Sequence, residues 1–219
     1  MSENYKSVFD IIGPVMVGPS SSHTAGAVMI GQVAHKLFLV PLKKITVAYY
    51  ESFAQTHQGH GTDYAIVAGI LGMQTDDLRV PNAVELARDQ GIEVIFKEMP
   101  GNSPIKHPNT AIITLENEFK KITVAGCSIG GGTIEIRKLE IDGQTFTPLG
   151  PLPIMLCWGV KDIPKSIKKS LDQGNVKIRK AVAPVKLKED YLCEFDLDKI
   201  PHQNILEQIK AVSKNLICL

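Results

Sequence analysis

Hydrophobic and polar positions recur along the chain with the periods of amphipathic helices and of partly buried strands. Apolar residues repeat at three- and four-residue spacing from Ala27 to Leu37, which predicts a helix there. Alternation over residues 45–50 is typical of a strand with both faces at least partly covered. The other elements predicted before residue 148 are an apolar segment at 7–12, helices at 64–72 and 83–90, and strands at 92–96, 110–115, 119–125 and 133–141.

The last three of these strands alternate apolar with polar or charged residues, and a short turn around Asn117 joins the first two. They are therefore expected to be antiparallel. Helices and strands in this order predict an α/β (α+β) N-terminal domain with a mixed sheet.

A change in composition separates this region from the rest of the chain. Residues 146–153 contain three prolines and a glycine, which is typical of a linker. Beyond it the pattern predicts, in order, a strand at 154–160, a helix at 164–171, strands at 176–182 and 191–197, a helix at 203–212 and a strand at 216–219. This βαββαβ order predicts a ferredoxin-like domain. The expected domains are residues 1–148 and 152–219.

Composition and charge narrow the class of protein. The chain has 219 residues, of which 44% are hydrophobic and 21% charged, as in ordinary globular proteins. The formal net charge of +1 argues against a nucleic-acid or membrane-surface partner. No apolar run approaches the ~18 residues of a membrane span, and the N-terminus lacks a signal-peptide pattern. The expected location is the cytoplasm.

The segment Gly18-Pro-Ser-Ser-Ser-His-Thr-Ala-Gly26 concentrates the candidate chemistry. It places four hydroxyls and one imidazole just before the first helix, where Ser22 or Thr24 can cap the helix N-terminus. A helix N-terminus favours negative charge, so this turn suits a small carboxylate. The alternative interpretation is a capped loop with a histidine of no special role.

Two glycine-rich segments are further candidates. Gly59-His-Gly-Thr-Asp63 leads into the helix at 64–72, with Thr62 or Asp63 as the expected cap. Three glycines, Gly130 to Gly132, interrupt the strand pattern. They indicate either a bulge or tight bend, or a place where a ligand or partner backbone approaches closely.

The four cysteines predict no metal centre of this chain's own. They are Cys127, Cys157, Cys193 and Cys218, with no C-x-x-C pair and no histidine at zinc-ligand spacing. Scattered thiols of this kind are expected to act as small apolar side chains. A complete metal or iron–sulfur site made by this chain alone is therefore not expected.

Several motifs together resemble the beta chain of iron–sulfur-dependent L-serine dehydratase. In order along the chain they are residues 8–26, Ser52-Phe-Ala, Gly59-His-Gly-Thr-Asp63, His107-Pro-Asn-Thr110 and Ser128-Ile-Gly-Gly-Gly132. The N-terminal domain also resembles an allosteric substrate-binding domain, and the C-terminal βαββαβ unit is similar to an ACT domain.

The resemblance implies a subunit of a lyase that converts L-serine to pyruvate and ammonia. It implies a [4Fe–4S] cluster held by an alpha subunit, with no metal ligand from this chain. It implies that His23 is the acid–base residue, since an ordinary histidine pKa near ~6.5 suits proton transfer at cellular pH. The substrate-binding residues that it implies are Ser20, Ser21, Ser22, Thr24, His60, Thr62, Asp63, His107, Asn109, Gly130, Gly131 and Gly132. His60 is expected to act with Asp63, and His107 with Asn109.

Two positions depart from the family pattern. Asp162-Ile-Pro-Lys165 stands where ACT domains commonly have Asp-x-Pro-Gly, and a lysine there argues against an effector approaching the backbone. Cys127 stands where a small residue is expected, and a buried structural thiol is the expected role.

The alternative function is a non-catalytic module that senses serine or another small carboxylate and regulates a partner. The absence of cluster-type cysteines keeps this alternative open, as does the option that the isolated chain forms a homodimer through the edges of its ACT-like domain.

Overall fold

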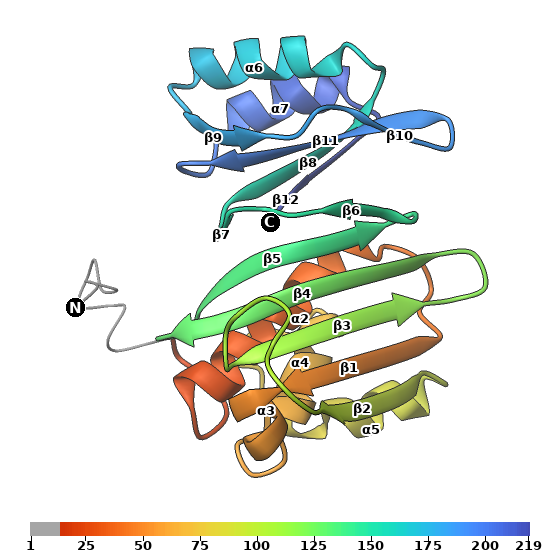
Figure 1. Cartoon of the computed structure of the whole chain (residues 1–219), viewed down its shortest axis with the longest axis vertical. Helices are drawn as coiled ribbons and strands as arrows, with labels where there is room; N and C mark the ends of the chain where they lie inside the picture. The colour runs from red at the N-terminus through yellow and green to blue at the C-terminus, as the bar shows by residue number, and fades with distance from the viewer. Residues whose placement is uncertain (1–13) are drawn as a thin grey trace. The chain divides into compact units, whose positions relative to one another are not determined.

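A computed structural model describes residues 14–219, so the apolar segment expected at 7–12 lies outside the described residues. The chain divides after Ile141 into two compact units. Each unit has its own sheet (Figure 1), and each is described by itself.

The first unit contains five paired strands and a set of helices. In chain order they are η1 (Ser21–Ala25), α2 (Gly26–Leu37), β1 (Lys44–Tyr50), α3 (Glu51–Thr56), α4 (Thr62–Ile70), η2 (Val80–Asn82), α5 (Ala83–Asp89), β2 (Glu93–Met99), β3 (Thr110–Glu116), β4 (Lys121–Gly130) and β5 (Thr133–Ile141). The strand order is β2-β1-β3-β4-β5. Only β1 and β2 are parallel, because helices connect them, and the other neighbours are antiparallel. The prediction of a mixed sheet is confirmed.

Helices cover one face of this sheet (Figure 1). α2 packs against β3, β4 and β5, and α4 packs against α2. The two helices approach closely because both carry a glycine at the crossing: a Cβ at Gly31 would lie 2.2 Å from the Ile66 carbonyl oxygen, and one at Gly69 would lie 2.0 Å from that of Val28. A larger residue at Gly31 or Gly69 would therefore force α2 and α4 apart.

The three glycines form the turn between β4 and β5. Gly130 pairs with Thr133, and the two residues between them, Gly131 and Gly132, have φ values of 60° and 81°. Tight hairpin turns require positive φ at these positions, which glycine adopts at little cost. Of the two explanations considered for these glycines, the bend accounts for their conformation.

The second unit contains the expected ferredoxin-like sheet. This sheet and its helices comprise β8 (Ile154–Gly159), α6 (Ile163–Gln173), β9 (Ile178–Ala181), β10 (Val185–Leu187), β11 (Asp190–Leu197), α7 (Gln203–Val212) and β12 (Asn215–Cys218). Two short strands that precede it in the chain, β6 (Gln144–Phe146) and β7 (Gly150–Pro151), are not part of this sheet. β8 lies between β11 and β12, and β9 and β10 both pair with β11. The predicted strand at 176–182 is thus shorter, and a separate strand, β10, follows it after Pro184, which lacks the N–H that a strand pair needs.

Both helices of the second unit pack on one face of its sheet (Figure 1). Ile163, Ile167 and Leu171 of α6 join Ile205 and Ile209 of α7 in a core with strand residues. Among residues 14–219 no helix has the length and hydrophobicity that a membrane span requires.

Candidate functional site

A widened helical turn carries the serine–histidine segment. Residues 21–25 form one π-helical turn that continues directly into α2. The cap is Ser20, whose Oγ accepts a hydrogen bond from the backbone N–H of His23 at 3.2 Å. The expectation that Ser22 or Thr24 would be the cap is wrong, because the helical turn begins earlier in the chain. The Ser22 hydroxyl instead contacts His23 Nδ1, and the Thr24 hydroxyl donates to the His60 carbonyl.

The His23 ring has a hydroxyl at each nitrogen. Ser22 Oγ lies 2.9 Å from Nδ1, and Ser52 Oγ, from the start of α3, lies 3.4 Å from Nε2. A hydroxyl can donate or accept, so either neutral tautomer of His23 keeps both contacts. Phe53 covers the ring with a centroid separation of 5.1 Å.

Burial lowers the pKa of His23 below its ordinary value, and the neighbouring His60 lowers it further. The two rings meet edge to face at 4.7 Å. A neutral imidazole that can exchange tautomers is suited to take up a proton and pass it on.

Thr24 ties the segment that carries His60 to this turn. Its Oγ1, on a fully buried side chain, donates to the His60 carbonyl at 3.1 Å. Thr62 is also fully buried. Thr24 and Thr62 are thus both inside the first unit.

Asp63 binds His57 rather than His60. Its carboxylate lies 2.7 Å from His57 Nδ1, and the Glu98 carboxylate lies 2.9 Å from Nε2 of the same ring. Asp63 does not cap α4; the cap position is Gly61, with a left-handed conformation and no side-chain bond. The expected cap at Thr62 or Asp63 is therefore wrong.

Two carboxylates, both acceptors, can be satisfied together only by a doubly protonated imidazolium ring. Burial by itself would lower the pKa of His57, but the hydrogen bonds to Glu98 and Asp63 outweigh it and raise the pKa above its ordinary value. The ring stacks on Tyr49 at 4.8 Å. Burial raises the pKa of Tyr49 well above its ordinary value, so this phenol stays neutral.

Ser128 connects the turn to the segment that carries His107 and Asn109. Asn109 Nδ2 donates to the Ser128 carbonyl at 3.4 Å, and the Ser128 N–H donates to the Asn109 carbonyl at 3.1 Å. The Ser128 side chain packs directly on Gly26, where a Cβ would lie 2.3 Å from Oγ. Ser128 Oγ is buried, and no described residue gives it a hydrogen bond.

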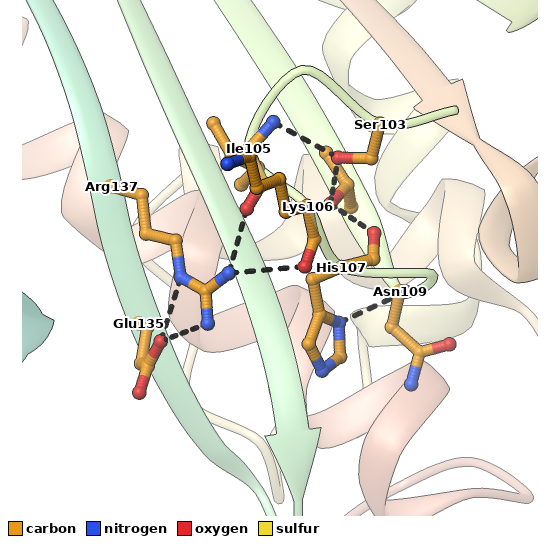
Figure 2. A network of polar contacts seen from close by, with 8 residues as sticks. Ser103, Ile105, Lys106, His107, Asn109, Glu135 and Arg137 are labelled. Atoms are coloured by element: carbon orange, nitrogen blue, oxygen red, sulfur yellow. Dashed lines mark hydrogen bonds and ion pairs between the residues drawn. The ribbon is translucent and has the colours of Figure 1, made fainter. Parts of the chain in front are cut away.

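His107 has one assigned ring nitrogen. The backbone N–H of Asn109 donates to His107 Nδ1 at 3.1 Å, so this nitrogen must carry a lone pair. The neutral ring then carries its hydrogen on Nε2. Burial lowers the pKa of His107, and the Arg137 cation lowers it further. The carboxylates of Glu135 and Glu51 raise it, but by less. The Nε2 atom of His107 can thus offer a neutral N–H donor. Figure 2 shows the contact between the other ring nitrogen and Asn109.

The remaining expected site residues have clear positions. The hydroxyl oxygens of Ser20 and Ser22 lie 3.3 Å apart. The Ser21 carbonyl accepts a hydrogen bond from the Gly26 N–H. Gly132 lies by this turn, since a Cβ there would be 3.8 Å from that of Ala25. Gly130 and Gly131 belong to the same hairpin turn.

Cys127 has the environment expected of a structural thiol. It is fully buried, packs with Ile105 and Ala125, and burial raises its pKa to about 11. Within the described part of the chain no three histidine, cysteine or acidic side chains come together so as to hold a metal ion.

The structure adds residues that the sequence reasoning did not assign to the site. Ser52 and Phe53 contact His23, Ser128 contacts Gly26, and Arg137 contacts the segment before His107. The motif beginning at Ser52 is a usable signal, because it lies two residues after the end of β1. Nothing in the sequence pattern indicated Arg137.

Fold and site together define a two-unit α+β protein with a polar, histidine-containing site in its first unit. Residues 7–138 match the model of the family described as serine dehydratase beta chain. This match covers more than half of the chain. The chain belongs to the serine dehydratase beta chain family.

Individual relatives agree with this assignment. The probable L-serine dehydratase beta chain of Bacillus subtilis (strain 168) is 52% identical over 136 residues, 62% of this chain and 61% of that one. The L-serine dehydratase beta chain of Peptoniphilus asaccharolyticus is 42% identical over 135 residues, 59% of each chain. The L-serine dehydratase of Haemophilus influenzae is 41% identical over 159 residues, 66% of this chain and 32% of that one. The chain thus spans less than two thirds of the length of these relatives.

Proposed function

We propose that this chain is the beta subunit of an L-serine ammonia-lyase that forms pyruvate and ammonia from L-serine. The observation that carries the proposal is the His23 ring with a hydroxyl at both nitrogens, next to a helix N-terminus. The names of the relatives, which include L-serine dehydratase beta chains, support it.

The proposal includes a [4Fe–4S] cluster held by an alpha subunit. The described residues do not fit a cluster site of their own, since Cys127, Cys157 and Cys193 are buried and no three potential ligands converge. Its ligands would then belong to the partner. This chain's own part is to bind the substrate and to move a proton.

His23 is the proposed acid–base residue. Dehydration removes the α-proton and the β-hydroxyl of serine, and the resulting enamine hydrolyses to pyruvate and ammonia. A base for the α-proton must be neutral before it acts, and burial together with His60 keeps His23 neutral. Ser22 and Ser52 hold the ring in place.

The hydroxyls of Ser20, Ser21 and Ser22 and the neutral donor of His107 are proposed to hold the substrate carboxylate and amino group. Fixing the carboxylate keeps the α-proton in line with the base. His60, Thr24 and Thr62 shape the surrounding segment. Asp63 acts at a distance, because its carboxylate is bound to His57.

Residues 1–148 are proposed to be the substrate-binding domain, and residues 152–219 an ACT-like domain. Lys165, in the first turn of α6, pairs with Asp162 at 3.3 Å, with both side chains largely exposed. A side chain at this turn obstructs an effector that would contact the backbone there. We propose that this domain has no amino-acid effector at the turn.

The test is anaerobic pyruvate formation from L-serine, by this chain alone and mixed with a cluster-bearing alpha subunit. The expected result is activity in the mixture only, lost in His23→Ala. Serine binding by the chain alone, without activity in any mixture, would contradict the lyase proposal and favour the sensing module.

A further inference from the structure

Arg137 fixes the segment before His107 from outside the expected site. Its guanidinium donates to the Ile105 carbonyl at 2.6 Å and to that of Lys106 at 3.3 Å. Glu135, two residues earlier on β5, binds the same guanidinium at 2.6 and 2.8 Å and sets its orientation (Figure 2). The side chains of Arg137 and Glu135 are only 30% and 16% exposed, so water competes weakly for these bonds.

A chain of hydroxyls holds the same segment from its inner side. Ser103 Oγ accepts from the Ile105 N–H and donates to Thr110 Oγ1 at 2.8 Å. Thr110 Oγ1 in turn donates to the His107 carbonyl at 2.6 Å. Both hydroxyl residues are buried. The backbone from 103 to 107 is therefore held on two sides, and Lys106 keeps a positive φ of 57° between them.

The two carbonyls that Arg137 binds directly precede His107, whose Nδ1 accepts the Asn109 N–H at 3.1 Å. That contact allows only the neutral tautomer with hydrogen on Nε2. Within residues 14–219 no hydrogen bond of Nε2 is found, so this N–H remains able to meet a ligand. A neutral N–H donor binds a carboxylate oxygen without giving up a proton.

We propose that Arg137 is a positioning residue that holds His107 in this tautomer, so that Nε2–H donates to the carboxylate of an amino-acid substrate. The identity of the substrate rests on the proposed function, whereas the tautomer does not. Arg137 itself touches no substrate in this proposal.

The positive charge of Arg137 also favours the neutral form of the His107 ring. The groups that act on His107 are Arg137 and Glu135 on β5 and Glu51 on α3. The cation disfavours protonation of the ring, and the two carboxylates favour it. Removing Arg137 and removing the charge of Glu135 must therefore move the titration of His107 in opposite directions.

The experiment is ring ¹⁵N NMR of the full chain labelled at its six histidines, with His107→Gln used for assignment. Wild type should show His107 with hydrogen on Nε2 and a midpoint below the ordinary 6.5. Arg137→Met should raise the midpoint, because it removes the cation that disfavours protonation, and should introduce the second tautomer. Arg137→Lys, which keeps the charge but lacks the planar fork, should disturb the tautomer and leave the midpoint in place.

Glu135→Gln should have the opposite effect to Arg137→Met and lower the titration midpoint of His107. Lys138→Met is the matched control: it removes the next cation on β5, which pairs with Glu140 at 2.5 Å, and should change neither reading. If Arg137→Met keeps the wild-type tautomer and midpoint, the proposal is wrong. It is also wrong if Arg137→Met and Glu135→Gln both raise the midpoint, because loosened packing alone would do that.

Activity separates this proposal from the function on which it rests. In the mixture with an alpha subunit, both Arg137 variants should reduce kcat/KM for L-serine about tenfold, and Lys138→Met should not. A mixture that forms no pyruvate even in wild type would remove the proposed function. The NMR result would still decide whether Arg137 positions His107.

Discussion

His23 and His57 lie in the same unit and have opposite electrostatic surroundings. His23 has a hydroxyl at each nitrogen, whereas His57 has a carboxylate at each nitrogen. Hydroxyls can form hydrogen bonds with either neutral tautomer of a histidine ring, whereas two carboxylates require a ring with an N–H group at both nitrogens. The pKa of His23 is lowered and that of His57 is raised.

The hydrogen-bonding partners of the two rings, more than their burial, therefore determine which ring is neutral and which is charged. Burial lowers the pKa of both rings, and only at His57 do acceptors reverse the shift. A neutral ring with adaptable partners can move protons. A charged ring between two carboxylates has a structural role, and here it links Asp63 of α4 to Glu98 of β2.

The largest expected effect is on catalysis. His23→Ala should reduce kcat for pyruvate formation in the mixture by about 10²–10⁴-fold, the usual contribution of one acid–base group. Its thermal unfolding should stay close to that of wild type, since the lost partners are hydroxyls. Near-normal turnover in His23→Ala would remove the catalytic assignment.

The next effect is on stability at His57. His57→Gln should lower the free energy of unfolding by about 1–3 kcal/mol at pH 6. Most of this belongs to the bond with Asp63, because the Glu98 side chain is 62% exposed and its pair is weakened by solvent. Denaturant unfolding measures the change.

The His57 contribution also depends on pH with a definite sign. Because the folded pKa is raised, the stabilisation is complete below 6.5 and is lost as pH rises through the folded pKa. Asp63→Asn should remove the same dependence, and the double variant should lose little more than either alone. Additive losses across the pH range would contradict the pairing.

The smallest expected effect concerns the hydroxyls at His23. Ser22→Ala and Ser52→Ala each remove one ring partner, worth about 0.5–1.5 kcal/mol. Each should reduce kcat/KM by a few-fold to about tenfold while turnover remains measurable. The steady-state comparison of the two variants shows which nitrogen depends more on its hydroxyl; no change in either would contradict a role for these contacts.

Much of the fold could be predicted from periodicity. The helix from 26 to 37, the three antiparallel strands and the order of the second unit all follow from spacing and turn residues. The strand β10 was missed: the strand predicted at 176–182 ends before Pro184, and the three residues of β10 are too few to show a periodic pattern.

The site was harder to predict because its contacts are long-range. His60 is closer in sequence to Asp63 than His57 is, yet the left-handed Gly61 and the start of α4 turn the carboxylate toward His57. Ser128 lies in one of the motifs, but its packing on Gly26 does not follow from motif spacing, and neither does the contact of Arg137 with the segment before His107. Local propensity finds the serine turn, and tertiary packing decides which residues it meets.

The most direct test of the contrast is the titration of His23 and His57 in one sample, followed by ring ¹⁵N NMR of the full chain. The account predicts that His23 stays neutral, with both tautomers populated, to a pH below 6.5, and that His57 remains doubly protonated above 6.5. If both rings titrate together near 6.5, or if His57 shows a single N–H at pH 6, the division of roles between them is contradicted.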